Sequence, residues 1–68
     1  MGELKNRVRE LRARDRLSQG QLAEVIGVSR QTIAMIEKGD YSPSVVIALK
    51  IADVFKEQVE SVFIWQGY

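Results

Sequence analysis

The apolar residues of this chain recur at helical spacing along most of its length. At its beginning, Leu4, Val8 and Leu11 stand at positions i, i+4 and i+7. This spacing places the three side chains on one face of a helix. The pattern predicts a first helix over about residues 4–14, with one apolar stripe directed toward a core.

Two shorter helices are predicted next, joined by a tight turn at Gly27 and Val28. Ser18 stands three residues before Gln21, which is the spacing of a capping box at a helix start. The apolar residues that follow fall at helical spacing: Leu22, Val25 and Ile26. Gly27 stands where the chain must reverse, and such a position often takes the left-handed conformation that glycine adopts readily.

After this turn, Ser29 is expected to cap a helix over about residues 30–38, with Ile33 and Ile36 on its inward side. The residues off that side project outward: Ser29, Arg30, Gln31, Ala34 and Met35. Arg and Gln at the start of an exposed helix face can hydrogen-bond bidentately to base edges in the DNA major groove. The alternative interpretation is an ordinary antiparallel helix pair with a solvated face.

A fourth helix, predicted over residues 45–55, is apolar on two sides. One stripe has the spacing expected of a core face: Val45, Ala48, Leu49, Ala52 and Phe55. A second stripe lies on the opposite side: Ile47, Ile51 and Val54. Because a helix that is apolar nearly all round requires burial on both faces, part of the second stripe should be covered by the C-terminus or by another copy of the chain.

The end of the chain changes character after a short helical turn at residues 59–62. Residues 63–68 are rich in aromatic and branched side chains, which are typical of β-structure rather than of a polar tail: Phe63, Ile64, Trp65, Gln66, Gly67 and Tyr68. With 68 residues the chain is expected to form one small domain over residues 1–68. The core of so small a domain is marginal, so oligomerisation would stabilise it.

Composition excludes several classes of function. Cysteine and histidine are both absent, which removes disulfides, zinc fingers and a histidine general base. Carboxylates are present, but no nucleophile–base set or metal-ligand set is, so neither an enzyme nor a cofactor or metal site is expected. No signal peptide or membrane span is visible, and we expect the protein in the cytoplasm.

The net charge is only +1, but its distribution is uneven. Residues 1–16 contain six basic and three acidic residues, whereas residues 51–68 contain one basic and three acidic residues. One end of the domain could therefore face phosphates while the other faces elsewhere. Such a charge run is equally compatible with an ordinary solvated face.

These motifs together resemble the phage-repressor (Cro-like, XRE-type) helix-turn-helix DNA-binding family. The matching segments stand in the family's order: Leu17-Ser18-Gln19, Val28-Ser29-Arg30-Gln31-Thr32-Ile33, Ile36-Glu37-Lys38-Gly39 and Ser42-Pro43-Ser44. The end of the chain is similar to the small single-domain repressors of the cytolysin-repressor type, in two further segments: Leu49-Lys50-Ile51-Ala52 and Phe63-Ile64-Trp65-Gln66. The resemblance covers about residues 6–63.

The resemblance implies an all-α fold, a five-helix lambda-repressor-like DNA-binding domain that leaves room for a short C-terminal β-strand. It implies that the third helix, about residues 30–38, enters the major groove. The expected base contacts come from its outward face: Arg30, Gln31, Ala34 and Met35. The expected contacts to the DNA backbone come from the helix starts and the following loop: Ser18, Gln19, Ser29, Thr32, Lys38 and Tyr41. Tyr41 would serve equally well in packing.

The family pattern also pairs an arginine of the first helix with a glutamate at the end of the third. Carried over to this chain, it implies a structural ion pair between Arg12 and Glu37. Both positions flank the inward side of their helices, which fits half-buried side chains at the seam. The alternative is two separate surface charges.

A homodimer is the remaining expectation. One recognition helix reads too few base pairs to locate a site in a genome, whereas two copies related by a two-fold axis double the contacts. The expected interface combines the second stripe of the fourth helix with the C-terminal segment: Ile47, Ile51, Val54, Phe63, Ile64 and Trp65. The sequence thus favours a dimeric repressor that binds double-stranded DNA at a palindromic operator. The alternative is an antitoxin or co-regulator that acts mainly through protein–protein interaction.

Overall fold

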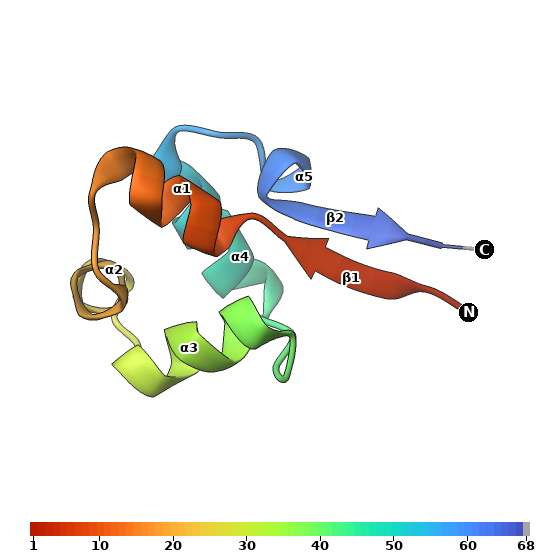
Figure 1. Cartoon of the computed structure of the whole chain (residues 1–68), viewed down its shortest axis with the longest axis horizontal. Coiled ribbons are helices and arrows are strands. Elements are labelled where there is room, and N and C mark those ends of the chain that lie inside the picture. Colours follow the sequence, from red (N-terminus) through yellow and green to blue (C-terminus); the bar gives the residue numbers. More distant parts are fainter. Residues whose placement is uncertain (68) are drawn as a thin grey trace.

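The computed structural model describes residues 1–67 of the chain (Figure 1). Within these residues it contains five helices and two short strands: β1 (Glu3–Asn6), α1 (Val8–Asp15), α2 (Gln19–Ile26), α3 (Arg30–Lys38), α4 (Val45–Phe55), α5 (Val59–Val62) and β2 (Phe63–Gln66). The family resemblance predicted the five helices and the C-terminal strand, but not β1. β1 and β2 pair antiparallel and project from the helices as a two-stranded ribbon, here called the β-ribbon. The five-helix DNA-binding fold with a short C-terminal strand is confirmed.

All five helices contribute to one apolar core. Its buried side chains come from every helix: Val8, Leu11, Leu22, Ala23, Ile26, Ile33, Ile36, Ile51, Ala52, Phe55 and Val62. Leu17 and Val28, in the connections, pack against it. The longest helix of residues 1–67 has 11 residues, and none in this stretch is long and apolar enough to cross a membrane.

The N-terminal segment is not helical, so the prediction of a first helix from residue 4 is wrong. Residues 3–6 form β1, and α1 begins at Val8. Leu4 is 37% exposed and lies opposite Trp65 in the strand pair. The strand is held by its hydrogen bonds to β2 and ends at Asn6. The Asn6 side-chain oxygen accepts a hydrogen bond at 3.1 Å from the amide of Val8, the first residue of α1, while Arg7 stands at the N-cap.

The predicted division of α4 into an inward and an outward apolar stripe is only partly correct. Ile51 is fully buried, and Ile47 and Val54 pack against the core. Val45 and Leu49, predicted to face inward, are 74% and 52% exposed. Ala52 and Phe55 are buried as expected. Both stripes have the same apolar character, so spacing alone could not identify which of them meets α1 and α2.

A smaller departure occurs on α2, where Val25 is 66% exposed although it was counted among the apolar residues of that helix. Its neighbours Leu22, Ala23 and Ile26 fill the core instead. Val25 lies at the surface, where it borders a shallow pocket with Lys50, Asp53 and Val54 of α4. Helical spacing therefore located the apolar stripe of α2 correctly and overestimated its width.

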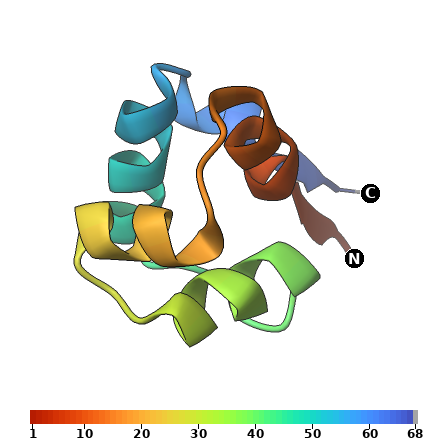
Figure 2. The same ribbon diagram turned by 60° about the vertical axis from the view of Figure 1, so that its left-hand side comes forward.

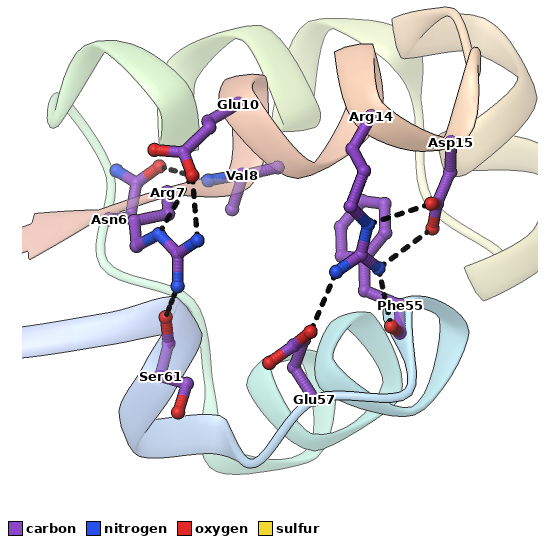
Figure 3. A network of polar contacts seen from close by, with 9 residues as sticks. All are labelled: Asn6, Arg7, Val8, Glu10, Arg14, Asp15, Phe55, Glu57 and Ser61. Atoms are coloured by element: carbon purple, nitrogen blue, oxygen red, sulfur yellow. Dashed lines mark hydrogen bonds and ion pairs between the residues drawn. The ribbon is translucent and has the colours of Figure 1, made fainter.

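Arginine side chains tie the first helix to the end of the fourth (Figure 3). Arg14 donates to the Phe55 carbonyl at 2.7 Å and forms ion pairs with Glu57 at 2.6 Å and Asp15 at 2.8 Å. Its hydrogen bonds lower the pKa of the Asp15 carboxyl below the usual value. Because Lys56 takes a left-handed conformation (φ 59°) at this helix end, which non-glycine residues rarely adopt, these bonds hold a strained turn in place.

Candidate nucleic-acid interface

The two helices of the predicted motif are defined by local capping. Ser18 and Gln21 form a reciprocal capping box at the start of α2, with bonds of 2.8 and 3.0 Å. Gly27 ends α2 in the left-handed conformation (φ 82°), and Val28 packs from the turn onto the core. Ser29 then caps α3 by accepting from the Thr32 amide at 3.1 Å. Each of these features was predicted from the residues.

α3 lies at the edge of the molecule beside α2 (Figure 2). Ile33 and Ile36 are buried, which fixes the opposite face toward solvent. On that face Ser29, Arg30 and Gln31 are exposed. Thr32, Ala34 and Met35 are half-buried, so they offer less surface to a ligand than the pattern suggested.

In the last turn of α3, Glu37 forms an ion pair with Arg12 of α1. Arg12 donates to both carboxylate oxygens of Glu37, and its third nitrogen donates to the Leu17 carbonyl at 3.0 Å. The side chains are only 15% and 6% exposed. The hydrogen bond to Glu37 raises the pKa of Arg12, and the carboxylate is held in a bidentate fork. The pair therefore locks α3 against α1.

Gln19 connects this ion pair to the exposed start of α3. Its amide nitrogen donates to Glu37 at 3.2 Å, and its amide oxygen accepts from Arg30 at 3.1 Å. The guanidinium of Arg30 is therefore held at the surface by a chain of hydrogen bonds that begins in the interior. The Gln19 amide is occupied in this arrangement, so its expected contact to a phosphate requires either the backbone amide or an exchange of partners.

Cationic side chains surround the same face. Arg9, Arg12 and Lys38 line a shallow groove together with Gln19 and Ala34. Lys38 is 73% exposed and lies 3.7 Å from Asp40, a surface pair too open to hold it firmly. Arg9 is exposed in this groove and was missed as a candidate, although it belongs to the basic run noted at the N-terminal end. Arg9 stands three residues before Arg12, a spacing that places both side chains on the same side of the helix. This spacing could have identified Arg9 as a candidate.

The loop after α3 borders a second cleft. Tyr41 is 40% exposed and lines, with Lys38, Asn6 and Pro43, a cleft of about 330 Å³ between this loop and β1. Among the described residues, no group of three or more side chains could hold a metal ion. The polar side chains that border the two clefts are of both signs, because Glu37 lines the first and Glu3 the second.

The expected dimer residues do not lie on one surface. Ile51 is fully buried within the monomer, so its assignment to an interface is wrong. Ile47, Val54 and Phe63 are half-buried against the core. The apolar residues that are exposed on α4 and β2 are a partly different set: Val45, Val46, Leu49, Ile64 and Trp65. Of the C-terminal segment 63–68, residue 68 lies outside the described residues.

Comparison with known proteins gives consistent matches. The helix-turn-helix family HTH_3 matches residues 8–61. The chain is 57% identical over 60 residues to the HTH-type transcriptional regulator YgzD of Bacillus subtilis, covering 88% of this chain and 91% of that one. It is 48% identical over 63 residues to the HTH-type transcriptional regulator MJ0272 of Methanocaldococcus jannaschii, covering 93% and 96%.

Among solved structures, the chain is similar to the restriction-modification controller protein C.AhdI of Aeromonas hydrophila. The TM-score is 0.75 at 34% identity, and the match covers 81% of this chain and 83% of that one. These relatives are transcriptional regulators and a controller protein by name, and none of the three is named as an enzyme.

Proposed function

The chain belongs to the helix-turn-helix family HTH_3 of DNA-binding transcriptional regulators, and on that premise we propose that it is a repressor that binds a palindromic operator as a homodimer. α3 is the recognition helix in this proposal. In this proposal the protein represses by occupying promoter DNA.

The main support for the proposal is that the polar start of α3 is exposed and is hydrogen-bonded to a buried ion pair. Arg30 and Gln31 are exposed, and Arg30 is connected through Gln19 to the buried Arg12–Glu37 pair. A fork of guanidinium donors fixed in this way suits bidentate bonds to the O6 and N7 atoms of guanine, and the Gln31 amide suits adenine. Ala34 and Met35 would add apolar contact to a thymine methyl group.

Backbone contacts would position this helix without reading sequence. Candidates are the helix starts and the cations at the rim of the groove: Ser18, Gln19, Ser29, Thr32, Lys38 and Tyr41, with Arg9 added from the structure. The amides of Gln19 and Gly20 at the start of α2 would face a phosphate, since the Gln21 amide already donates to Ser18.

Replacing Lys38 by alanine tests this positioning role. We expect binding to weaken by a similar factor on every DNA sequence, because a phosphate contact carries no sequence information. The slope of log K against log salt should fall by about one unit, as for the loss of a single phosphate contact. The measurement is fluorescence anisotropy on labelled duplexes at several salt concentrations. An unchanged slope would remove Lys38 from the interface.

The homodimer would use the exposed apolar side chains of α4 and β2. Leu49 and Trp65 are 52% and 66% exposed, and α5 packs against both elements that carry them. A surface of this kind on so small a monomer is suited to a second copy. The two-fold axis would set the two recognition helices about 34 Å apart, one turn of DNA.

Sedimentation equilibrium at low micromolar concentration tests this interface. We expect a dimer for the wild type and a monomer for the double variant Leu49→Glu, Trp65→Ala, since a buried carboxylate without a partner opposes association. Val25→Glu is the matched control, because Val25 is also an exposed apolar residue (66%) but lies on α2. It should remain a dimer. A monomeric wild type would overturn the interface.

Selection of bound duplexes from random DNA tests the function itself. The proposal predicts an enriched motif with two inverted half-sites whose centres are about one helical turn apart. Recovery of no motif, together with capture of a partner protein, would instead support the antitoxin or co-regulator alternative. Repression then follows if transcription from a promoter that carries the motif falls when the protein is added.

A further inference from the structure

The β-ribbon and α3 are joined at one polar residue, Asn6, which the sequence pattern did not mark. Asn6 is the last residue of β1 and lies opposite Phe63 in the strand pair. Its amide nitrogen donates to the Ile36 carbonyl in the last turn of α3, at 3.0 Å. Among the described residues this is the only hydrogen bond between the β-ribbon and α3.

The same side chain fixes the start of α1. Its amide oxygen accepts from the Val8 amide at 3.1 Å, while the neighbouring Arg7 amide donates to the Val62 carbonyl at 2.8 Å. The asparagine amide supplies one acceptor and two donors, so it can serve both bonds at once. Turning the amide over would break both, because an amine would then face the Val8 amide and an oxygen would face the Ile36 carbonyl.

Beyond Asn6 the ribbon separates from α3. The cleft of about 330 Å³ lies between them, lined by Leu4 on the ribbon and by Lys38 and Tyr41 on the other side. Leu4 and Trp65 form a cross-strand pair on the same face of the ribbon as Asn6 and Phe63, because strand side chains alternate. Phe63 packs on the core, whereas Leu4 and Trp65 extend past it and are partly exposed.

We propose that Asn6 is the positioning residue that holds the recognition helix at a fixed angle to the β-ribbon, and so determines the half-site spacing that the dimer accepts. This inference rests on the proposed function, in which the ribbon carries Trp65 of the dimer interface and α3 reads DNA. The Asn6–Ile36 bond then lies on the direct path between the two-fold axis and the recognition helix.

A small change at the Asn6–Ile36 bond would displace the start of α3 by a larger distance. α3 has nine residues, a length of about 13 Å, and Asn6 holds the end opposite to Arg30. A rotation of roughly 10° about that end would move the start of the helix by about 2 Å, a large part of the ~3.4 Å rise of one base pair. The Arg12–Glu37 pair holds α3 to α1. Glu37 borders a shallow pocket with residues of β1, but within residues 1–67 neither member of the pair forms a hydrogen bond to the β-ribbon. Loss of the Asn6 bond would therefore allow the β-ribbon to move more freely relative to α3.

Two substitutions separate the two roles of Asn6. In Asn6→Ser the hydroxyl can still accept from the Val8 amide, since serine forms the same turn to an amide two residues on, but it is too short to reach Ile36. In Asn6→Asp the bond from the Val8 amide is also kept, and a carboxylate oxygen faces the Ile36 carbonyl. Arg14→Gln is the control for general destabilisation, because it removes a side-chain bond to a helix-end carbonyl at Phe55, on the other side of the domain from α3 (Figure 1).

The experiment uses the motif selected by the wild type, with the spacer between half-sites changed by one and two base pairs. The dissociation constant of each duplex is measured for the wild type and the three variants. We expect the wild type to lose affinity steeply at altered spacing. Asn6→Ser and Asn6→Asp should bind the preferred spacing about three- to tenfold more weakly, the factor of one hydrogen bond, and discriminate spacings less. Arg14→Gln should keep the wild-type profile.

Two results would overturn the inference, and they are distinguishable. If the wild type binds all spacings alike, the proposal of a palindromic operator is wrong. The proposed function and the role of Asn6 are then wrong as well. A wild type with a sharp spacing preference that Asn6→Ser retains in full would leave the proposed function standing and reduce the role of Asn6 to its bond with the Val8 amide.

Discussion

Replacing Glu37 by alanine is expected to remove a large part of the free energy of unfolding of this protein. The substitution leaves the Arg12 guanidinium 15% exposed without its carboxylate partner. Removing one member of a buried pair typically costs about 3–5 kcal/mol, because the remaining charge is desolvated and uncompensated. A domain of this size has a free energy of unfolding of only about 3–10 kcal/mol, from roughly 0.05–0.15 kcal/mol per residue.

Urea unfolding followed by far-UV circular dichroism measures this loss. The control is the double variant Arg12→Met, Glu37→Leu, which replaces both charges by apolar side chains of similar size. It should recover most of the stability, since an apolar substitute for a buried pair is often neutral or stabilising. If Glu37→Ala unfolds within about 1 kcal/mol of the wild type, the pair behaves as an exposed one and does not lock α3.

The second large effect is expected on DNA recognition. Arg30→Ala should weaken binding to the selected motif by about 1–3 kcal/mol and relax the preference at one base pair in each half-site. Its fold should be unaffected, because Arg30 is exposed and its hydrogen bond to Gln19 lies at the surface. Binding of the variant to the motif and to its single-base changes is measured by anisotropy.

Arg30→Lys is the matched control for this prediction. It keeps the charge but loses the planar fork that bonds to two acceptors of guanine. It should therefore retain affinity for random DNA while losing discrimination at the same base pair. Equal weakening of Arg30→Ala on the motif and on random DNA would assign Arg30 to a phosphate instead of a base.

Features encoded by neighbouring residues were predicted correctly from the sequence. The capping box at Ser18, the left-handed Gly27, the cap at Ser29 and the stop at Gly39 each depend on a few adjacent residues, and the structure contains all four. The bounds of α4 were also predicted. The Arg12–Glu37 contact came from the family pattern and is present in the structure.

The features that were missed depend on distant parts of the chain. Leu4 has the spacing of a helix residue, but its strand requires β2, where its partner is Trp65 near the other end of the chain. The inward face of α4 is decided by its neighbours α1 and α2, since both of its stripes are apolar. Asn6 has no periodic signal at all, because its role depends on a carbonyl of α3 thirty positions away.

Recognition of a DNA sequence through α3 is measured by competition binding. A labelled duplex carrying the selected motif is titrated with the wild-type protein at about 0.15 M salt, and unlabelled motif and random duplexes are added as competitors. Specific recognition predicts that the motif competes at least about 10³-fold more effectively than random DNA. If the two duplexes compete within tenfold of each other, the protein does not recognise a DNA sequence specifically.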